Sequence, residues 1–486
     1  MTDTSRRPSN FRPGRSSTTF IGCLIVGVGL ILRAAAIGGE LWLDEIWSLL
    51  KVSPLSSPIE IVTALKHDNN HILNSLWMWL WGPTHTSAVY RAPSLIFSAL
   101  LLWLLLVRTP AQLEGKVPTL WLALVAGSYP LTLYGTEARG YSLALLCTGM
   151  AFFSLCRLTE HPFDRRSIWA FAVAAMIGCV SHAIFILFLA PATAWLVWRL
   201  CRQPLLGNSR AILWYGIVPP VLVACGLTLT FYRDMEIGGA PLLPYLEVAA
   251  STVSIAFGGQ TLSSINPDVT GWSIVLALAV ILACVAELIA WVRTGSSLAS
   301  LVALIMVTPW IAVSIFQPHF ILPRYFIIQI FFAYLLVARF LDRLIRQGRF
   351  GFLIATLLLG TYIVTNTTHT ISLATLGRSH FVEIFAGIVS HERDEQIGIG
   401  GDQDFQNSIR LSYARLLAPE TARLVYVPLY RSAILPPRYI IRETIESYED
   451  FPADVELRPG VTYRRVKQYR APPLNGSHVT VYEIVK

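Results

Sequence analysis

The chain has 486 residues, of which 54% are hydrophobic and only 14% are charged, and its formal net charge is +8. Soluble domains carry about 25% charged residues, so this composition, with a mean hydropathy of +0.55, excludes a single soluble core. It is typical of a protein with many membrane-spanning helices. In such a protein a basic excess is first a signal of membrane orientation, so no nucleic-acid partner is expected.

The chain begins with a polar, arginine-containing tail, residues 1–18, before the apolar run 19–38. That run is too long for a cleaved signal peptide, so we expect a signal anchor whose tail stays in the cytoplasm. A spanning helix needs about 20 apolar residues, and by this measure the chain has about eleven spans. They are predicted at 19–38, 88–107, 119–136, 140–157, 168–182, 184–199, 211–231, 272–292, 298–316, 324–340 and 351–370.

The apolar segment 71–82 is only about 12 residues long, and a helix of that length covers roughly 18 Å, little more than half of a bilayer core. We interpret it as a half-inserted helix that does not cross. Most Lys and Arg residues of the loops then lie on the cytoplasmic side, as the positive-inside rule expects. The alternative, in which 71–82 crosses, turns the arginine-rich loops outward and fits the rule less well.

Residues 371–486 carry many charges and no run of membrane-spanning length. We expect a polytopic α-helical membrane domain at 19–370 and an extracytoplasmic α/β domain at 371–486, in a multi-pass protein of the cell membrane. Alternating patterns predict three strands, and an amphipathic pattern predicts one helix. These are the strands 424–427, 439–441 and 479–482 and the helix 408–417.

Two adjacent acids, Asp44 and Glu45, follow the first span and are flanked by Trp42 and Trp47. Tryptophan prefers the membrane–water interface. A carboxylate beside another carboxylate and apolar walls has a raised proton affinity, which suits a general base near neutral pH. We interpret Asp44 as a candidate catalytic base and Glu45 as a residue that orients it or binds a ligand. The simpler alternative is that both acids cap a helix at the membrane surface.

Two histidines lie on the same predicted side. His71 opens the short helix, and His182 lies in a turn between two spans. With nearby carboxylates they could hold a divalent metal ion that neutralises a phosphate leaving group. Isolated histidines in such places are more often hydrogen-bonding residues, and no HExxH pattern is present, so both interpretations stay open.

Arg139 and Arg324 lie at the outer ends of spans, against the positive-inside trend. A planar guanidinium at this depth can bind a phosphate or pyrophosphate, with Glu137 holding Arg139 and His319 assisting Arg324. Alternatively, both side chains only snorkel to the membrane surface. Arg33 lies inside the first span, where a charge is a functional candidate by default, but no function is assigned to it.

The set and order of these motifs resemble the membrane glycosyltransferases of the GT-C superfamily, in particular the family of protein O-mannosyltransferases and bacterial aminoarabinose transferases (family 39). The similarity covers roughly residues 1–200, with weaker support from a later turn. The matching motifs are Trp42-Leu43-Asp44-Glu45, His71-Ile72-Leu73-Asn74, Arg91-Ala92-Pro93-Ser94, Glu137-Ala138-Arg139-Gly140-Tyr141, Ser181-His182 and Pro323-Arg324-Tyr325.

The resemblance implies inverting transfer of a sugar from a polyprenyl-phosphate donor to a lipid, glycan or protein acceptor outside the cytoplasm. It implies that Asp44 is the catalytic base and that the histidine matching His182 binds a metal ion in some relatives. The chain departs from the family where His71 lacks a following Pro-Pro and where Asn69 and Asn70 replace an acid.

Two other functions fit the same residues. A transporter or flippase of lipid-linked sugars binds the headgroup with the same basic and aromatic groups but needs no proton-accepting acid. A non-catalytic membrane scaffold depends on the domain at 371–486 and not on Asp44.

Overall fold

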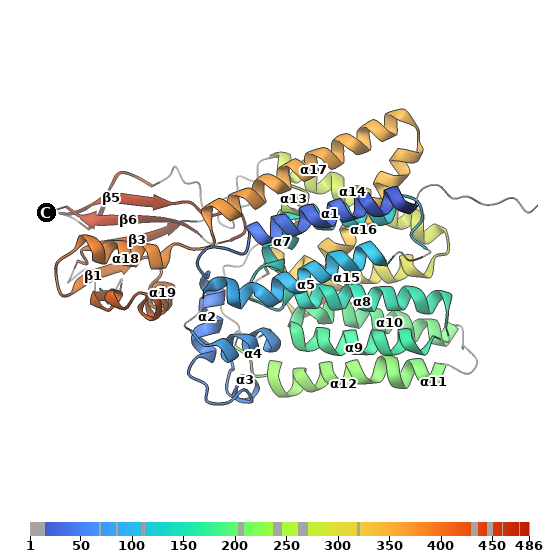
Figure 1. Ribbon diagram of the computed structural model, residues 1–486, viewed down its shortest axis with the longest axis horizontal. Helices are drawn as coiled ribbons and strands as arrows, with labels where there is room; N and C mark the ends of the chain where they lie inside the picture. Colours follow the sequence, from blue (N-terminus) through green and yellow to red (C-terminus); the bar gives the residue numbers. More distant parts are fainter. Residues whose placement is uncertain are drawn as a thin grey trace, which may run out of the picture.

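The computed structural model shows a long bundle of helices with a small sheet domain at one end (Figure 1). It describes residues 15–485 except 68–69, 84–85, 109, 111, 163, 203–208, 237–244, 261–270, 318–320, 429–435, 445–450, 459 and 476. The helices of the bundle are α1 (Arg15–Ala35), α2 (Leu43–Val52), α3 (Glu60–Thr63), α4 (Ile72–Trp81), α5 (Ser87–Val107), α6 (Val117–Gly127), α7 (Tyr129–Gly135), α8 (Tyr141–Glu160), α9 (Arg165–Ser181), η1 (Ala183–Phe185), α10 (Ile186–Arg202), α11 (Ser209–Ala211), η2 (Ile212–Ile217), α12 (Val218–Leu227), η3 (Thr228–Tyr232), α13 (Tyr245–Ala256), α14 (Gly271–Arg293), α15 (Ser297–Phe316), η4 (Pro323–Phe326), α16 (Ile327–Arg346) and α17 (Arg349–Leu376).

Within the described part of the chain, eight helices are long and apolar enough to cross a membrane, or nine if the bent pair α6 and α7 is one span. All of the spans predicted from the sequence fall on helices. The predicted spans at 19–38 and 168–182 correspond to α1 and α9, which are not among the eight. Helix α4 has 10 residues, about 15 Å at 1.5 Å per residue, and is too short to cross.

Helices α8 and α16 form the centre of the bundle. In their most apolar windows 78% and 72% of the residues are buried, against 22–44% in the other candidate spans. The outer helices turn apolar side chains outward, such as Leu282 and Leu357, which are 67% and 61% exposed. An apolar outer surface of this kind suits a lipid environment, so the bundle is consistent with a membrane protein.

The predicted span at 119–136 is broken next to Pro130, a residue that weakens a continuous helix. Proline has no N–H for the carbonyl of Ala126, four residues earlier, and its ring clashes with that group. Helix α6 therefore ends at Gly127, and α7 starts at an angle of 61° to it. The Ser128 hydroxyl caps α7 by accepting a hydrogen bond from the backbone N–H of Leu131 at 3.1 Å.

Arg33 fills the gap that this break leaves. Its guanidinium donates to the carbonyls of Ala126 and Val125 at 3.0 and 3.1 Å and to the Ser98 hydroxyl at 2.7 Å. The side chain is only 1% exposed. Backbone carbonyls in an apolar interior need such partners, so Arg33 has a structural role inside the bundle.

The C-terminal domain is a six-stranded sheet in the order β2-β1-β3-β6-β5-β4, in which β1 is parallel to β2 and β3 and the other pairs are antiparallel. Successive residues of β3 face opposite ways: Ile441 packs with α18 and α19, and Ile440 packs in a cluster on the other face. The elements are α18 (Phe381–His391), β1 (Ile397–Gly401), α19 (Asp404–Leu417), η5 (Pro419–Arg423), β2 (Leu424–Tyr426), β3 (Tyr439–Thr444), β4 (Asp454–Arg458), β5 (Val461–Tyr469) and β6 (His478–Ile484).

The three predicted strands and the predicted helix of this domain are confirmed as β2, β3, β6 and α19, whereas β1, β4 and β5 were not predicted. The domain is held to the bundle by side chains. Ile409 and Tyr413 of α19 pack with Leu49 of α2. The Glu40 carboxylate accepts hydrogen bonds at 3.0 and 2.9 Å from two backbone N–H groups in the first turn of α18, as a helix N-terminus favours.

Candidate functional site

Segments that are distant in the sequence meet at the end of the bundle that faces the sheet domain (Figure 1). Asp44 lies in the first turn of α2, Arg139 in the turn between α7 and α8, and Arg324 in η4. One Asp44 oxygen, Oδ2, is 2.6 Å from Nη1 of Arg139 and 2.8 Å from Nη1 of Arg324. The Asp44 side chain is 26% exposed, more than either arginine. A single carboxylate thus balances two guanidinium groups.

This environment stabilises the ionised form of Asp44. Burial by itself raises the pKa of Asp44, but the charges of Arg324 and Arg139 outweigh it and leave the pKa below its ordinary value. The raised proton affinity expected from the sequence is therefore wrong for this state of the site. The reason is that the neighbouring carboxylate faces elsewhere, and two positive charges occupy its place.

Glu45 points away from Asp44 into a closed network with Arg91. Its two oxygens accept from Nε and Nη2 of Arg91 at 2.9 and 2.5 Å, and Oε1 also accepts from the backbone N–H of Ala138 at 2.7 Å. The remaining guanidinium contacts go to backbone carbonyls at 37–40. Both side chains are fully buried. Glu45 is thus placed to position the first turn of α2, which carries Asp44, against the turn that carries Arg139.

Aromatic rings surround the two arginines beside Asp44. The Arg324 guanidinium carbon lies 5.6 Å from the Trp42 ring centre and 5.8 Å from that of Tyr325, and the Arg139 carbon lies 5.4 Å from that of Tyr141. Such contacts hold a guanidinium in place without using its N–H groups. The buried Nε atoms of Arg139 and Arg324 have no hydrogen-bond partner among the described residues, so each has a donor to spare.

The two histidines lie near each other, with ring centres 6.3 Å apart, and both are buried. His71 contacts the hydroxyls of Ser48 and Ser75 through its two ring nitrogens at 3.3 and 3.2 Å. Burial, and then the charge of Arg139, lowers the pKa of His71 to about 3. His182 stacks on Tyr141 at 4.4 Å, and burial lowers its pKa well below the ordinary value. Both rings are neutral at neutral pH.

The histidines do not fit a metal ion in this arrangement. Nδ1 of His182 accepts a hydrogen bond from the backbone N–H of Ile184 at 3.2 Å, so the proton of the neutral ring is on Nε2. That nitrogen then has no lone pair for a metal, but it is a hydrogen-bond donor, and it has no partner in the described structure. No group of three or more potential ligands among His, Cys, Asp and Glu comes together in the described residues.

Glu137 is buried behind Arg139. Its Oε1 is 3.5 Å from Nη1 of Arg378, which follows α17, and its Oε2 has no described partner. Burial raises the pKa of Glu137 to about 7, although the charge of Arg378 opposes the shift. Arg378 also donates to the Thr136 hydroxyl at 2.7 Å and to the Leu133 carbonyl at 3.1 Å. The start of the C-terminal region therefore supports the turn that carries Arg139.

Gly140 allows two turns of the site to touch. A Cβ atom at this position would lie 1.9 Å from the carbonyl oxygen of Ser181 and 3.2 Å from Cβ of His71. Only glycine can bring the turn of Arg139 this close to that of His182. The short helix is joined here too, because the backbone N–H of Ala183 donates to the carbonyl of Asn70 at 3.0 Å.

Six of the residues chosen from the sequence thus lie in one place: Asp44, His71, Glu137, Arg139, His182 and Arg324. Glu45 is next to them but faces Arg91, and His319 lies outside the described residues. Sequence reasoning missed Arg378, which has no motif around it, and gave Arg91 no function, although it lies in a recognised motif.

A search against protein-family models finds no match to this chain, and a search of curated proteins finds none either.

Proposed function

We propose that the protein is a membrane glycosyltransferase that moves a sugar from a polyprenyl-phosphate donor to an acceptor, with inversion at the anomeric carbon and with Asp44 as general base. The observation that carries the proposal is the meeting of Arg139 and Arg324 on one carboxylate at the end of an apolar bundle. The order of the sequence motifs points to the same reaction class.

The charge balance favours an anionic ligand. Glu45 and Arg91 neutralise each other, and Glu137 is paired with Arg378, so Asp44 is left with two guanidinium groups. Buried charges without partners are costly, and a phosphate accepts several charge-assisted hydrogen bonds from arginine. The spare Nε–H donors of Arg139 and Arg324, and Nε2–H of His182, suit phosphate oxygens.

The donor phosphate would take over the arginines that now hold Asp44. Once the phosphate pairs with these arginines, they stabilise the Asp44 carboxylate less, and the pKa of Asp44 rises towards the value that a general base requires. The acceptor oxygen then bonds to the anomeric carbon as the bond from that carbon to the phosphate oxygen breaks. Asp44 receives the acceptor's proton, and the leaving polyprenyl phosphate takes the electron pair of the broken bond, so it gains one negative charge that Arg139 and Arg324 balance.

We propose an orientation of the protein in the membrane as well. We place the site and the C-terminal domain outside the cytoplasm, because the loops at the opposite end of the bundle carry most of the arginines.

The test is transfer of radiolabelled sugar from a panel of polyprenyl-phosphate sugars, in membranes that contain wild-type or Asp44→Asn protein. Wild type is expected to label an acceptor, and Asp44→Asn is expected to be about 10²–10⁴ times slower. Asp454→Asn, which removes an exposed carboxylate paired with Arg464, is the matched control. Near-normal transfer by Asp44→Asn would contradict the proposal. Movement of lipid-linked sugar across the bilayer without transfer would instead indicate a transporter.

A further inference from the structure

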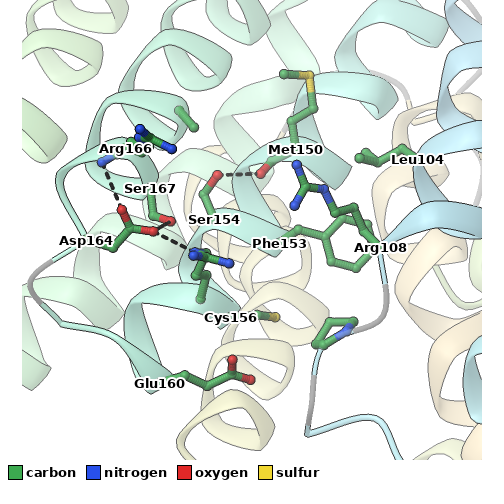
Figure 2. Close-up of a pocket in the computed structure, with 13 residues that line it drawn as sticks. Leu104, Arg108, Met150, Phe153, Ser154, Cys156, Glu160, Asp164, Arg166 and Ser167 are labelled. Atoms are coloured by element: carbon green, nitrogen blue, oxygen red, sulfur yellow. Dashed lines mark hydrogen bonds and ion pairs between the residues drawn. The ribbon is translucent and has the colours of Figure 1, made fainter.

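A second polar region lies at the end of the bundle opposite to Asp44. Helix α5 begins near Glu45 and ends just before Arg108, and α8 begins after Arg139 and carries Arg157 in its last turn. Between α5, α8 and α9 lies a groove of about 400 Å³ (Figure 2). That volume lies within the range of small-molecule sites, about 300–1,000 Å³.

One part of the groove is apolar and reaches the outer surface of the bundle. Leu104, Met150, Phe153 and Ala170 line it, and Met150 is 39% exposed. These side chains belong to helices α5, α8 and α9. They lie nearer to the middle of the bundle than the arginines of the groove do. In a membrane this part would face acyl chains.

The other part is basic. Arg108, Arg157 and Arg166 line it where the three helices end or begin, and Ser154 and Met150 lie between Arg108 and Arg166 in Figure 2. Arg157 donates from Nε to Asp164 at 2.6 Å. Within the described part of the chain, the guanidinium groups of Arg108 and Arg166 form no ion pair.

A neighbouring pocket at the same end of the bundle has arginines that are all paired within the chain. There Glu287 pairs with Arg339 and Arg343 at 3.0 and 2.5 Å, and Asp342 pairs with Arg346 at 2.8 Å. Each arginine of that pocket has a carboxylate of the chain as its partner. The groove differs, because two of its three arginines do not.

We propose that this groove binds an anionic phospholipid, with its phosphate between Arg108 and Arg166 and its upper acyl chains on Met150, Phe153 and Ala170. Basic pockets between helices at the ends of membrane spans bind anionic headgroups in this way. The apolar part argues for a lipid over a free anion. The proposal depends on the helices crossing a bilayer and is independent of glycosyl transfer.

The test uses the purified full-length protein in detergent and native mass spectrometry with phosphatidylglycerol and phosphatidylcholine of the same acyl chains. Wild type is expected to retain phosphatidylglycerol in preference to phosphatidylcholine. Arg108→Gln with Arg166→Gln is expected to lose about fivefold in affinity per arginine. Arg293→Gln changes an exposed arginine at the end of α14 and is expected to keep the preference.

Two further variants separate charge from folding. The Lys pair, Arg108→Lys with Arg166→Lys, keeps the charge and is expected to keep most of the preference. Glu160→Gln removes the groove's second carboxylate and is expected to tighten phosphatidylglycerol binding. Equal retention of both lipids by wild type, or an undiminished preference in the Gln pair, would overturn the proposal. So would full competition by inorganic phosphate, because it has no chains to cover the apolar part.

Discussion

At the scale of single residues, the proposed function requires that the Asp44 carboxylate and a donor phosphate share the same two guanidinium groups. Asp44 holds Nη1 of Arg139 and of Arg324 at 2.6 and 2.8 Å, so under the proposed function a donor phosphate competes with it for these two groups. Under the proposed function, Asp44 is then both the general base and an internal competitor of the substrate. The two functions of Asp44 can be separated by measuring binding and transfer on the same variant.

Asp44→Asn is therefore expected to bind a polyprenyl phosphate about tenfold more tightly than wild type, because the arginines lose their internal anion. The same variant is expected to transfer sugar poorly. Tryptophan fluorescence titration with a polyprenyl phosphate in detergent measures the affinity, with Asp454→Asn as control. Weaker or unchanged binding by Asp44→Asn would show that the arginines do not receive the phosphate.

Glu137 gives a prediction about pH, because burial raises its pKa from 4.5 to about 7. Between these values the unfolded chain releases the proton and the folded protein keeps it, so stability falls as the pH rises through this window. Glu137→Gln removes the effect. Measured against wild type, the variant is expected to be up to about 3 kcal/mol more stable at about pH 8 than at about pH 4.5.

Thermal unfolding in detergent at the two pH values measures this gain. Glu420→Gln, at an exposed position, is the control. An equal difference between Glu137→Gln and wild type at both pH values would mean that Glu137 does not titrate in this window.

The sequence was informative about which residues gather in the site, and much less about how they pair. Asp44, Arg139 and Arg324 each lie at the end of an apolar run. The number of predicted spans between them and the distribution of Lys and Arg therefore predict that they lie on the same side of the membrane. Their partners depend on contacts such as Arg91 with Glu45, 46 residues apart, and Arg378 with Glu137, 241 residues apart. Local pattern carries no signal for such pairs.

At the scale of elements, the break between α6 and α7 and the burial of Arg33 are one feature. An apolar run of membrane-spanning length predicts one helix at 119–136, but Pro130 divides it, and the freed carbonyls need donors. Arg33 supplies them from another helix. The strands β1 and β5 were missed for another reason: one is rich in glycine, which is rare in strands, and the other is rich in charged residues.

Arg33→Met keeps the bulk of the side chain and removes its donors. Two buried carbonyls lose their partners, each at a cost of about 1–3 kcal/mol, so the unfolding temperature in detergent is expected to drop clearly. Arg349→Met, at an exposed arginine that opens α17, is expected to leave it unchanged. An unchanged unfolding temperature of Arg33→Met would show that those carbonyls have other hydrogen-bond donors.

At the scale of the whole molecule, the site lies where the bundle meets the sheet domain. Arg378, Glu40 and α19 all connect the two parts close to the start of α2, where Asp44 lies. The apolar seam of Ile409 and Tyr413 against Leu49 therefore steadies the helix on which Asp44 lies. The sequence predicted a separate domain after 370 but contained no sign of this docking.

Ile409→Ala is expected to loosen the seam, since removing a buried isoleucine side chain costs about 2–5 kcal/mol. Limited proteolysis should then cut the chain between the bundle and the domain faster, and sugar transfer should fall. Leu417→Ala, on the same helix but 41% exposed, should change neither. Faster proteolysis with unchanged sugar transfer would show that the reaction does not depend on docking of the domain.

The ion pairs of Asp44 also affect which anions can bind at the site. Asp44 is tethered beside Arg139 and Arg324, so its effective concentration there is of the order of mM or more. Under the proposed function, free phosphate in the surrounding medium has to outcompete this tethered group. A lipid-linked donor meets the same barrier but is concentrated by the bilayer itself. Under the proposed function, the resting site therefore favours anions that arrive through the membrane over phosphate in solution.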